Sequence, residues 1–359
     1  MYRYLFLVFI FIVPLTGCIP AATAVDPAPA AAGLPQPELT LEQAPTGVPT
    51  LLPTAAPSPT PTPTPHPMQI EALRTGSYPG SDIVIEEELE PGANYRRYYA
   101  HYLSEGLKIY ALLTVPNGAM PEGGFPAIVF NHGYIPPAEY RTTERYVAYV
   151  DRLARSGYIV FRIDYRGHDR SEGSPSSAYS SPGYTVDVLN AVSALQRFSQ
   201  ANRDKIGMWG HSMGGFLTLR AMVVSDAVKA GVIWAGVVAP YTDMLYNWRH
   251  NDLPFTVSRP GGWRSGWVQQ FGAPEENPDF WDSVSANAYL ADLSGPVQLH
   301  HGSADSEVPM AFSQTLYDQI DAAGGEVEYY LYAGDNHNLS NQFNTAMQRT
   351  IDFYDRYLK

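Results

Sequence analysis

Residues 205–216, Lys-Ile-Gly-Met-Trp-Gly-His-Ser-Met-Gly-Gly-Phe, contain the pattern G-x-S-x-G centred on Ser212. An apolar run at 206–209 predicts a strand before the pattern, and an apolar run at 216–224 predicts a helix after it. The turn between this strand and this helix is too tight for side chains at Gly210 and Gly214. It holds the Ser212 hydroxyl away from the backbone, at the N-terminus of the helix. An ordinary Gly-rich turn is the alternative, but the flanking strand and helix favour a nucleophile elbow.

Predicted strands and helices alternate along most of the chain on both sides of this elbow. The strands are expected at 83–89, 95–102, 107–115, 126–130, 158–165, 206–209, 232–238, 297–300 and 327–332. The helices are expected at 146–154, 186–195, 216–224, 309–324 and 345–357. This alternation predicts an α/β fold with a mostly parallel, doubly wound sheet that helices cover on both faces.

The interval 241–287 interrupts the alternation, because it has no clear strand and is rich in large aromatic residues. These are Tyr246, Trp248, Trp263, Trp267, Phe271, Phe280 and Trp281. The interval lies between two late strands, on the side where loops cover an active site in this kind of fold. One interpretation is a cap that lines an apolar pocket, and the other is an insertion whose aromatic residues pack a small core of their own.

Composition restricts the class of protein. The chain has 359 residues, 45% of them hydrophobic, which is enough for a sizeable core in one large domain or two small ones. Its 36 acidic and 23 basic side chains give a formal net charge of −13. Because such a balance does not neutralise a phosphate backbone, it argues against nucleic-acid binding.

Residues 1–17 are predicted to be a signal peptide. Arg3 supplies a positive start, and 4–15 form an apolar core that is short for a membrane span. The segment leads into Leu15-Thr16-Gly17-Cys18, which resembles the lipobox of bacterial lipoproteins. By that resemblance Cys18, the only cysteine, is acylated and anchors the protein to a membrane on the extracytoplasmic face of the cell envelope. An ordinary secretory signal, which would leave a secreted enzyme, is the alternative.

Residues 18–67 predict an extended tether between this anchor and the folded part. Fourteen of the 31 prolines fall between residues 20 and 67, and the stretch ends in Ser/Thr-Pro repeats followed by His66. Such a composition buries no core and favours polyproline II, with a rise of about 3.1 Å per residue. The hydrolase-like domain is therefore expected at 68–359.

Two later loops supply partners for Ser212. Serine is a weak nucleophile that needs a base, and the base needs a carboxylate to orient it. In a fold with this elbow both partners follow late strands, in the order Ser, Asp, His. Asp305 follows the strand at 297–300, and His337 follows the strand at 327–332. The sequence therefore predicts a triad of Ser212, Asp305 and His337.

Other residues compete for these two roles. Asp243 is the main rival for the acid and Glu307 a weaker one, while Asp305 itself also suits a helix N-cap or a loop turn. The remaining histidines lack the loop position that selects His337. They are His66, His101, His132, His168, His211, His250, His300 and His301.

The tetrahedral intermediate of acyl transfer needs two hydrogen-bond donors. One is expected from the backbone N–H of Met213, next to the nucleophile. The other is expected from Asn131-His132-Gly133-Tyr134, the loop after the strand at 126–130. Gly133 lets the backbone approach a substrate closely, and the Tyr134 N–H is the candidate donor. A plain strand-ending turn is the alternative.

Five segments together resemble the α/β-hydrolases, and in particular the catalytic domain of the prolyl oligopeptidase-like (S9) group and its esterase relatives. They are Asn131-His132-Gly133, Asp164-Tyr165-Arg166-Gly167-His168, Gly210-His211-Ser212-Met213-Gly214-Gly215, His301-Gly302-Ser303-Ala304-Asp305 and His337. The resemblance covers roughly residues 80–359. It implies the same Ser212, Asp305 and His337 triad, and a structural role for 164–167.

The sequence departs from the pattern of that group in two respects. No β-propeller precedes the catalytic domain in this chain, and His132 stands where many peptidases of the group place the tyrosine of the oxyanion hole. Both departures, together with the aromatic interval, favour small acyl esters over peptides as substrates.

The predicted function is a lipid-anchored, extracytoplasmic serine hydrolase that cleaves an ester or amide through an acyl-enzyme. A carboxylesterase-like activity is preferred, with a serine exo- or oligopeptidase of the S9-like group as the alternative. The expected substrate is a small acyl ester, an amide or a short peptide, and the chemistry needs no metal or organic cofactor. A surface-binding lipoprotein without catalysis is the alternative from another class.

Overall fold

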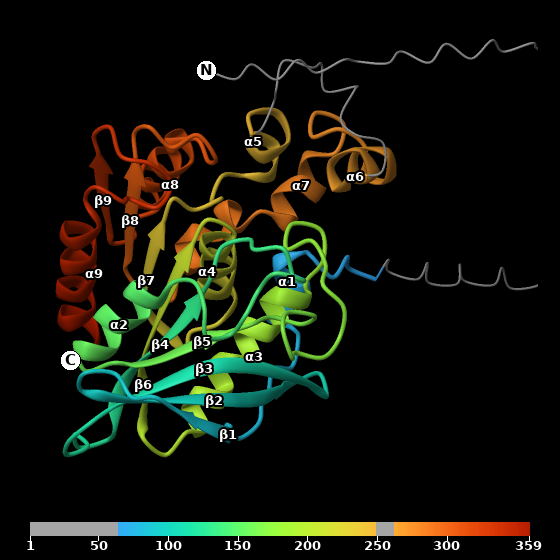
Figure 1. The fold of residues 1–359 in the computed structure, drawn as a ribbon. Helices are drawn as coiled ribbons and strands as arrows, with labels where there is room; N and C mark the ends of the chain where they lie inside the picture. The colour runs from blue at the N-terminus through green and yellow to red at the C-terminus, as the bar shows by residue number, and fades with distance from the viewer. Residues whose placement is uncertain (1–63, 249–261) are drawn as a thin grey trace, which may run out of the picture. The chain divides into compact units, whose positions relative to one another are not determined.

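The computed structural model describes residues 64–248 and 262–359, which belong to one compact unit (Figure 1). The predicted signal peptide at 1–17, Cys18 and nearly all of the predicted tether at 18–67 lie outside the described residues. Within the described ranges, no helix combines the length and the apolar character that crossing a membrane requires.

A single nine-stranded sheet forms the centre of the molecule, in the order β1-β2-β3-β5-β4-β6-β7-β8-β9. Its first strands are β1 (Val84–Leu89), β2 (Tyr95–Ser104), β3 (Leu107–Pro116), β4 (Phe125–Asn131) and β5 (Ile159–Ile163). The later ones are β6 (Ala201–His211), β7 (Val228–Trp234), β8 (Val297–Gly302) and β9 (Val327–Tyr332). The pairings of β1 with β2, β2 with β3 and β3 with β5 are antiparallel, and every pairing from β5 to β9 is parallel. The predicted mostly parallel sheet is confirmed.

Helices cover both faces of this sheet, as the alternation predicts (Figure 1). On one face, α2 (Val147–Arg155) and α9 (Phe343–Leu358) bury their apolar side chains against Trp209, Val232 and their neighbours. On the other face, α3 (Gly183–Arg197), α4 (Met213–Val224) and α8 (Met310–Ala322) pack into a larger core. Because both faces are buried, central strands such as β4 have no exposed residue and read as continuous apolar runs.

Several predicted boundaries differ from the observed ones, and three of the differences occur at left-handed or capping residues. The strand predicted at 232–238 is β7 at Val228–Trp234, because Ala235 turns left-handed with a φ of 47°. The residues after it stay buried without being a strand. Helix α2 begins after Tyr146, which has a φ of 48°, and α8 begins after Pro309, which is its N-cap. A short helix α1 (Ile70–Arg74) was not predicted.

The interval predicted as a cap is helical in its described residues and contains no strand there. It comprises α5 (Tyr241–Tyr246), α6 (Trp263–Phe271), α7 (Pro278–Val284) and a 3₁₀ helix η2 (Ala286–Asp292). The His66 ring, placed in the tether by the sequence, packs at 5.2 to 5.9 Å from the rings of Trp267, Phe271 and Phe280. The packed part of the chain therefore begins before residue 68.

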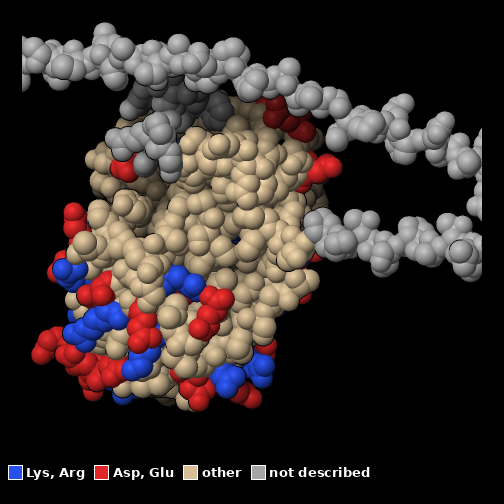
Figure 2. Space-filling view, turned by 90° about the vertical axis from the view of Figure 1, so that its right-hand side faces the viewer, with Lys and Arg blue, Asp and Glu red and all other residues tan. Residues whose placement is uncertain are grey.

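Charged side chains are unevenly spread over the face drawn in Figure 2. They gather over its lower part, at the level of the antiparallel strands β1–β3 in Figure 1, and are fewer at the level of the cap helices above. Strand β1 itself exposes Glu86, Glu87 and Glu88 at the sheet edge. Acidic side chains along an edge strand disfavour pairing with another chain.

Two glycines set the distance between β6, α4 and β4. A Cβ on Gly210 would lie 2.3 Å from the carbonyl oxygen of Gly214, and a Cβ on Gly214 would lie 2.0 Å from that of Asn131. Any side chain would push α4 away from the strands at the point where β6 turns into the helix. The steric argument made from the sequence for both glycines is confirmed.

We expect Gly214→Ala to lower the free energy of unfolding by about 3 kcal/mol, because α4 must move away from β4 to accommodate the methyl group. Urea unfolding followed by circular dichroism measures the change. The matched control is Gly266→Ala in α6, where a Cβ would meet no atom within 4 Å. It should leave the protein equally or up to about 1 kcal/mol more stable. Equal destabilisation by both substitutions would contradict the argument.

Candidate active site

Ser212 lies at the turn between β6 and α4, with a φ of 55° and a ψ of −116°. This conformation is unfavourable for a residue with a side chain, and two backbone hydrogen bonds hold it. The Ser212 N–H donates to the Trp234 carbonyl at 2.9 Å, and the Ser212 carbonyl accepts from the Val237 N–H at 3.1 Å. This strand–turn–helix geometry is the one that the predicted nucleophile elbow requires.

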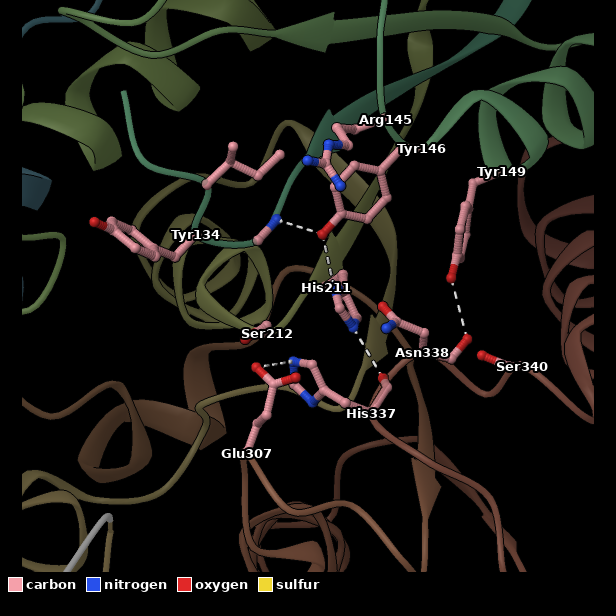
Figure 3. A pocket seen from close by; sticks show the side chains of 12 residues that line it. Tyr134, Arg145, Tyr146, Tyr149, His211, Ser212, Glu307, His337, Asn338 and Ser340 are labelled. Carbon is pink, nitrogen blue, oxygen red and sulfur yellow. Dashed lines mark hydrogen bonds and ion pairs between the residues drawn. The ribbon is translucent and has the colours of Figure 1, made fainter. Parts of the chain in front are cut away.

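The structure brings Asp305 and His337 into contact from the loops after β8 and β9. The His337 Nδ1 lies 2.7 Å from the Asp305 Oδ2, and the side chain of Asp305 is fully buried. Since a carboxylate accepts, the Nδ1 carries the proton of this bond, and the Nε2 is the nitrogen left to face a substrate. Ser212 and His337 line the same cavity (Figure 3).

Asp305 is held as a carboxylate. Its burial opposes ionisation, but hydrogen bonds from His301, His337 and the Val308 N–H outweigh burial and lower the pKa of Asp305. The Asp305 Oδ1 accepts the N–H groups of Glu307 at 2.8 Å and Val308 at 3.0 Å. Asp305 therefore also forms the loop turn that the sequence left open as its alternative role.

The rival residues lie elsewhere or make different contacts. The Asp243 carboxylate accepts the side-chain amide of Asn247, and it makes no ion pair with a histidine among the described residues. Glu307 lies 3.9 Å from the His337 Nε2, on the side opposite Asp305. His132 is fully buried, with its ring 4.4 Å from those of both Tyr140 and Tyr165.

The two predicted oxyanion donors have no acceptor in the described part of the chain. Met213 is the first residue of α4, so its N–H has no partner within the helix. No hydrogen bond of the Tyr134 N–H occurs among the described residues, whereas the Gly133 N–H donates to the Tyr146 hydroxyl at 2.9 Å. The Gly133 amide is therefore occupied, and the next amide along the loop is available.

A chain of hydrogen bonds links three loops of the site (Figure 3). The Tyr146 hydroxyl accepts from Gly133 and lies 2.7 Å from the Nδ1 of His211, and the Nε2 of His211 lies 2.9 Å from the carbonyl oxygen of His337. Because a carbonyl only accepts, the His211 Nε2 donates, and its Nδ1 accepts from Tyr146. Burial lowers the pKa of His211 to about 3. The ring is therefore uncharged at neutral pH, and it keeps this arrangement of one donated and one accepted hydrogen bond.

Tyr146 is a site residue that the sequence analysis missed. Its position suits the apolar face of a helix, and the sequence assigned it there. The two consecutive left-handed residues, Arg145 with a φ of 51° and Tyr146 with a φ of 48°, turn it towards the elbow instead. Nothing in the local sequence pattern indicates this turn.

Two cavities meet at Ser212. The first, of about 490 Å³, is polar and is lined by Gly133, Tyr134, Ile135, Arg145, Tyr146, Tyr149, His211, Ser212, Glu307, His337, Asn338 and Ser340. The second, of about 280 Å³, is lined by Tyr134, Ser176, Ser177, Ala178, Tyr179, Ser212, Met213, Trp248, Trp263 and Arg264. We call them the polar cavity and the aromatic cavity.

Both interpretations of the aromatic interval hold, for different residues. Trp248 and Trp263 line the aromatic cavity beside Ser212, as a cap would. Trp267, Phe280 and Trp281 are buried and pack against one another, with ring centroids 5.6 to 6.0 Å apart. The insertion therefore has a small core that supports its pocket-lining face.

The elbow, the mostly parallel sheet and the loops at its carboxyl edge define an α/β-hydrolase. The model of the prolyl oligopeptidase family matches residues 145–359, and the chain belongs to this family. It is a serine hydrolase of the S9 group, which contains peptidases and esterases.

Two relatives that this chain matches are described as peptidases. The "uncharacterized peptidase YtmA" of Bacillus subtilis is 26% identical over 263 residues, which cover 73% of this chain and 93% of that protein. A "probable dipeptidyl-aminopeptidase B" of Coccidioides posadasii is 26% identical over 296 residues, which cover 77% of this chain and 30% of that protein. The chain thus spans nearly all of the first relative and less than a third of the second.

Among solved structures, an acetyl xylan esterase from Paenibacillus sp. R4 is similar in fold. The TM-score is 0.60 and the sequences are 17% identical, with 80% of this chain and 92% of that chain covered. At this identity the likeness concerns the fold alone.

We expect Tyr146→Phe to lower kcat/KM about 10-fold, because removing the hydroxyl breaks its hydrogen bonds with the Gly133 amide and the His211 ring, and a net loss of about 1.4 kcal/mol corresponds to that factor. The substitution leaves the cavity volume almost unchanged, so KM should change little. Steady-state hydrolysis of a p-nitrophenyl ester measures both constants.

The matched control is Tyr158→Phe, whose hydroxyl bonds to the Asp355 carboxylate at 2.6 Å and lines neither cavity. It should lower the stability without changing kcat. If the two variants had the same kcat/KM as the unmodified protein, the hydrogen-bond chain would have no part in the reaction.

Proposed function

We propose that this chain hydrolyses an ester or amide of a small acyl group through an acyl-enzyme on Ser212. The observation that carries the proposal is the 2.7 Å contact of His337 with the buried Asp305, on the wall of a cavity that also contains Ser212. Asp305 fixes the imidazole, and the Nε2 of His337 is then the base next to the nucleophile.

The steps follow from these positions. The Ser212 Oγ attacks the acyl carbon while His337 takes its proton, and the N–H groups of Tyr134 and Met213 bind the developing oxyanion. His337 then gives that proton to the leaving oxygen or nitrogen as its bond to the acyl carbon breaks. Water then attacks the acyl-enzyme while His337 takes its proton, and His337 returns that proton to the Ser212 Oγ as the acid is released.

The aromatic cavity supports an acyl group that is small and apolar. It adjoins Met213, whose amide is an expected oxyanion donor, and its walls include Tyr179, Trp248 and Trp263. Two backbone donors and this restricted volume favour a carboxylesterase-like activity. A serine peptidase of the S9 group is the second candidate, and the two peptidase relatives described above favour it.

The test of catalysis is labelling with a fluorophosphonate probe, which phosphonylates an activated serine. We expect the unmodified protein to label and Ser212→Ala not to label, with kcat reduced on the order of 10⁴-fold or more. Ser156→Ala, which removes a hydroxyl bonded to the Arg152 carbonyl, is the control and should label normally. Equal labelling of the unmodified protein and Ser212→Ala would leave a non-catalytic binding protein as the better description.

Graded substrates separate the two candidate activities. p-Nitrophenyl esters of increasing acyl length are compared with aminoacyl and dipeptidyl amides. Efficient turnover of short-chain esters supports the esterase, and strong amide turnover with negligible ester turnover reverses the preference.

We propose further that Cys18 is acylated and holds the domain at the extracytoplasmic face of a membrane. The lipobox-like Leu15-Thr16-Gly17-Cys18 and the proline-rich stretch after it support this location. Metabolic labelling with a fatty acid should mark the unmodified protein in the membrane fraction and leave Cys18→Ala unlabelled. Label on Cys18→Ala would exclude this anchor, and an unlabelled, released native protein would indicate a secreted enzyme.

A further inference from the structure

The two cavities beside Ser212 suit the two parts of a substrate, the acyl group and the leaving group. The inference drawn from them rests on the proposed function. A histidine that protonates the leaving atom must lie on the leaving-group side of the nucleophile. His337 lines the polar cavity and does not line the aromatic cavity, whereas Met213 lines only the aromatic cavity. The acyl group therefore extends towards Trp248 and Trp263, and the leaving group extends into the polar cavity.

Opposite charges stand on the walls of the polar cavity. Figure 3 shows Arg145 above, beside Tyr146, and Glu307 below, beside His337. The Glu307 carboxylate lies 3.9 Å from the His337 Nε2, which is the atom that hands a proton to the leaving group. Arg145 lies away from that proton, on the wall that faces the rest of the leaving group.

Arg145 has no anionic partner within the described ranges. The ion pairs there involve Arg74, Arg155, Arg166, Arg197 and Arg356, and none involves Arg145. Its guanidinium is exposed and borders the cavity, so its hydrogen-bond donors are available to a ligand.

Hydrogen bonds from a buried side chain fix the backbone turn that contains Arg145. Arg145 and Tyr146 are both left-handed, which costs free energy in residues with side chains. The fully buried guanidinium of Arg162 donates hydrogen bonds to the carbonyls of Thr142, Glu144 and Arg145. An internal arginine thus fixes the turn that presents Arg145 to the cavity.

We propose that the polar cavity binds a leaving group with a carboxylate, and that Arg145 is the residue that recognises it. The guanidinium fork matches a carboxylate in geometry and charge. The leaving atom lies beside His337 and Glu307, and the carboxylate reaches across the cavity to Arg145. The substrate class is an acyl group joined either to an amino acid through nitrogen or to a hydroxy acid through oxygen.

Two matched pairs of substrates test the proposal, each with the acyl group that the ester series shows to be best. The ester pair has 3-hydroxybenzoate or 3-hydroxybenzamide as the leaving group, and the amide pair has phenylalanine or phenylalanine amide. The readout is the ratio of kcat/KM for the charged member to that for the neutral member. Turnover of the ester pair, the amide pair or both identifies the hydroxy acid, the amino acid or both as the source of the carboxylate.

We expect Arg145→Gln to lower this ratio about 10-fold or more, and Arg145→Lys to lower it less, since lysine keeps the charge without the fork. Arg155→Gln removes the same charge from α2, where Arg155 pairs with Asp151 at 3.6 Å, and should leave the ratio unchanged. In parallel, 3-hydroxybenzoate should slow fluorophosphonate labelling more than 3-hydroxybenzamide does, and Arg145→Gln should abolish that difference.

Two negative results have different meanings. If the charged-to-neutral ratio or the protection difference is the same in Arg145→Gln as in the unmodified protein, Arg145 recognises no carboxylate and only this inference fails. If the unmodified protein neither labels with the fluorophosphonate nor hydrolyses any member of the pairs, the proposed function fails.

Discussion

The close approach of α4 to β4 and β6 is the constraint on which the site depends. Gly210 and Gly214 leave no space for a Cβ, so the first turn of the helix lies directly against the Asn131 backbone. This contact brings the amide of Met213 next to the loop that carries Tyr134, although the two residues follow different strands. A side chain at Gly214 would move Ser212 and Met213 away from the loop that carries Tyr134, the proposed second oxyanion donor.

Burial then assigns the charges around Ser212. His211 is neutral because desolvation lowers its pKa to about 3, and it serves as a fixed donor and acceptor between Tyr146 and His337. Asp305 is also buried, yet its hydrogen-bond donors keep it ionised. The same physical effect therefore gives opposite outcomes, according to whether a group has donors that favour its charged form.

The fold and the positions of Ser212, Asp305 and His337 could be predicted because each depends on a local signal, a strand-like run followed by a loop. Arg145 and Tyr146 could not, because a buried arginine from β5 holds their left-handed backbone, and that contact has no trace in the spacing of nearby residues. The end of β7 was missed for a related reason. The apolar residues after Ala235 are buried under other elements without pairing as a strand, and periodicity does not separate those two states.

The sheet order has a consequence for how activity is acquired during folding. The residues around Ser212 follow β4, β6, β8 and β9, and β5 lies between β3 and β4 although it follows both of them in the chain. Parallel pairings between distant segments form slowly, because long loops close before any contact compensates for their entropy. The appearance of hydrolysis during refolding would therefore report completion of the parallel sheet through β9.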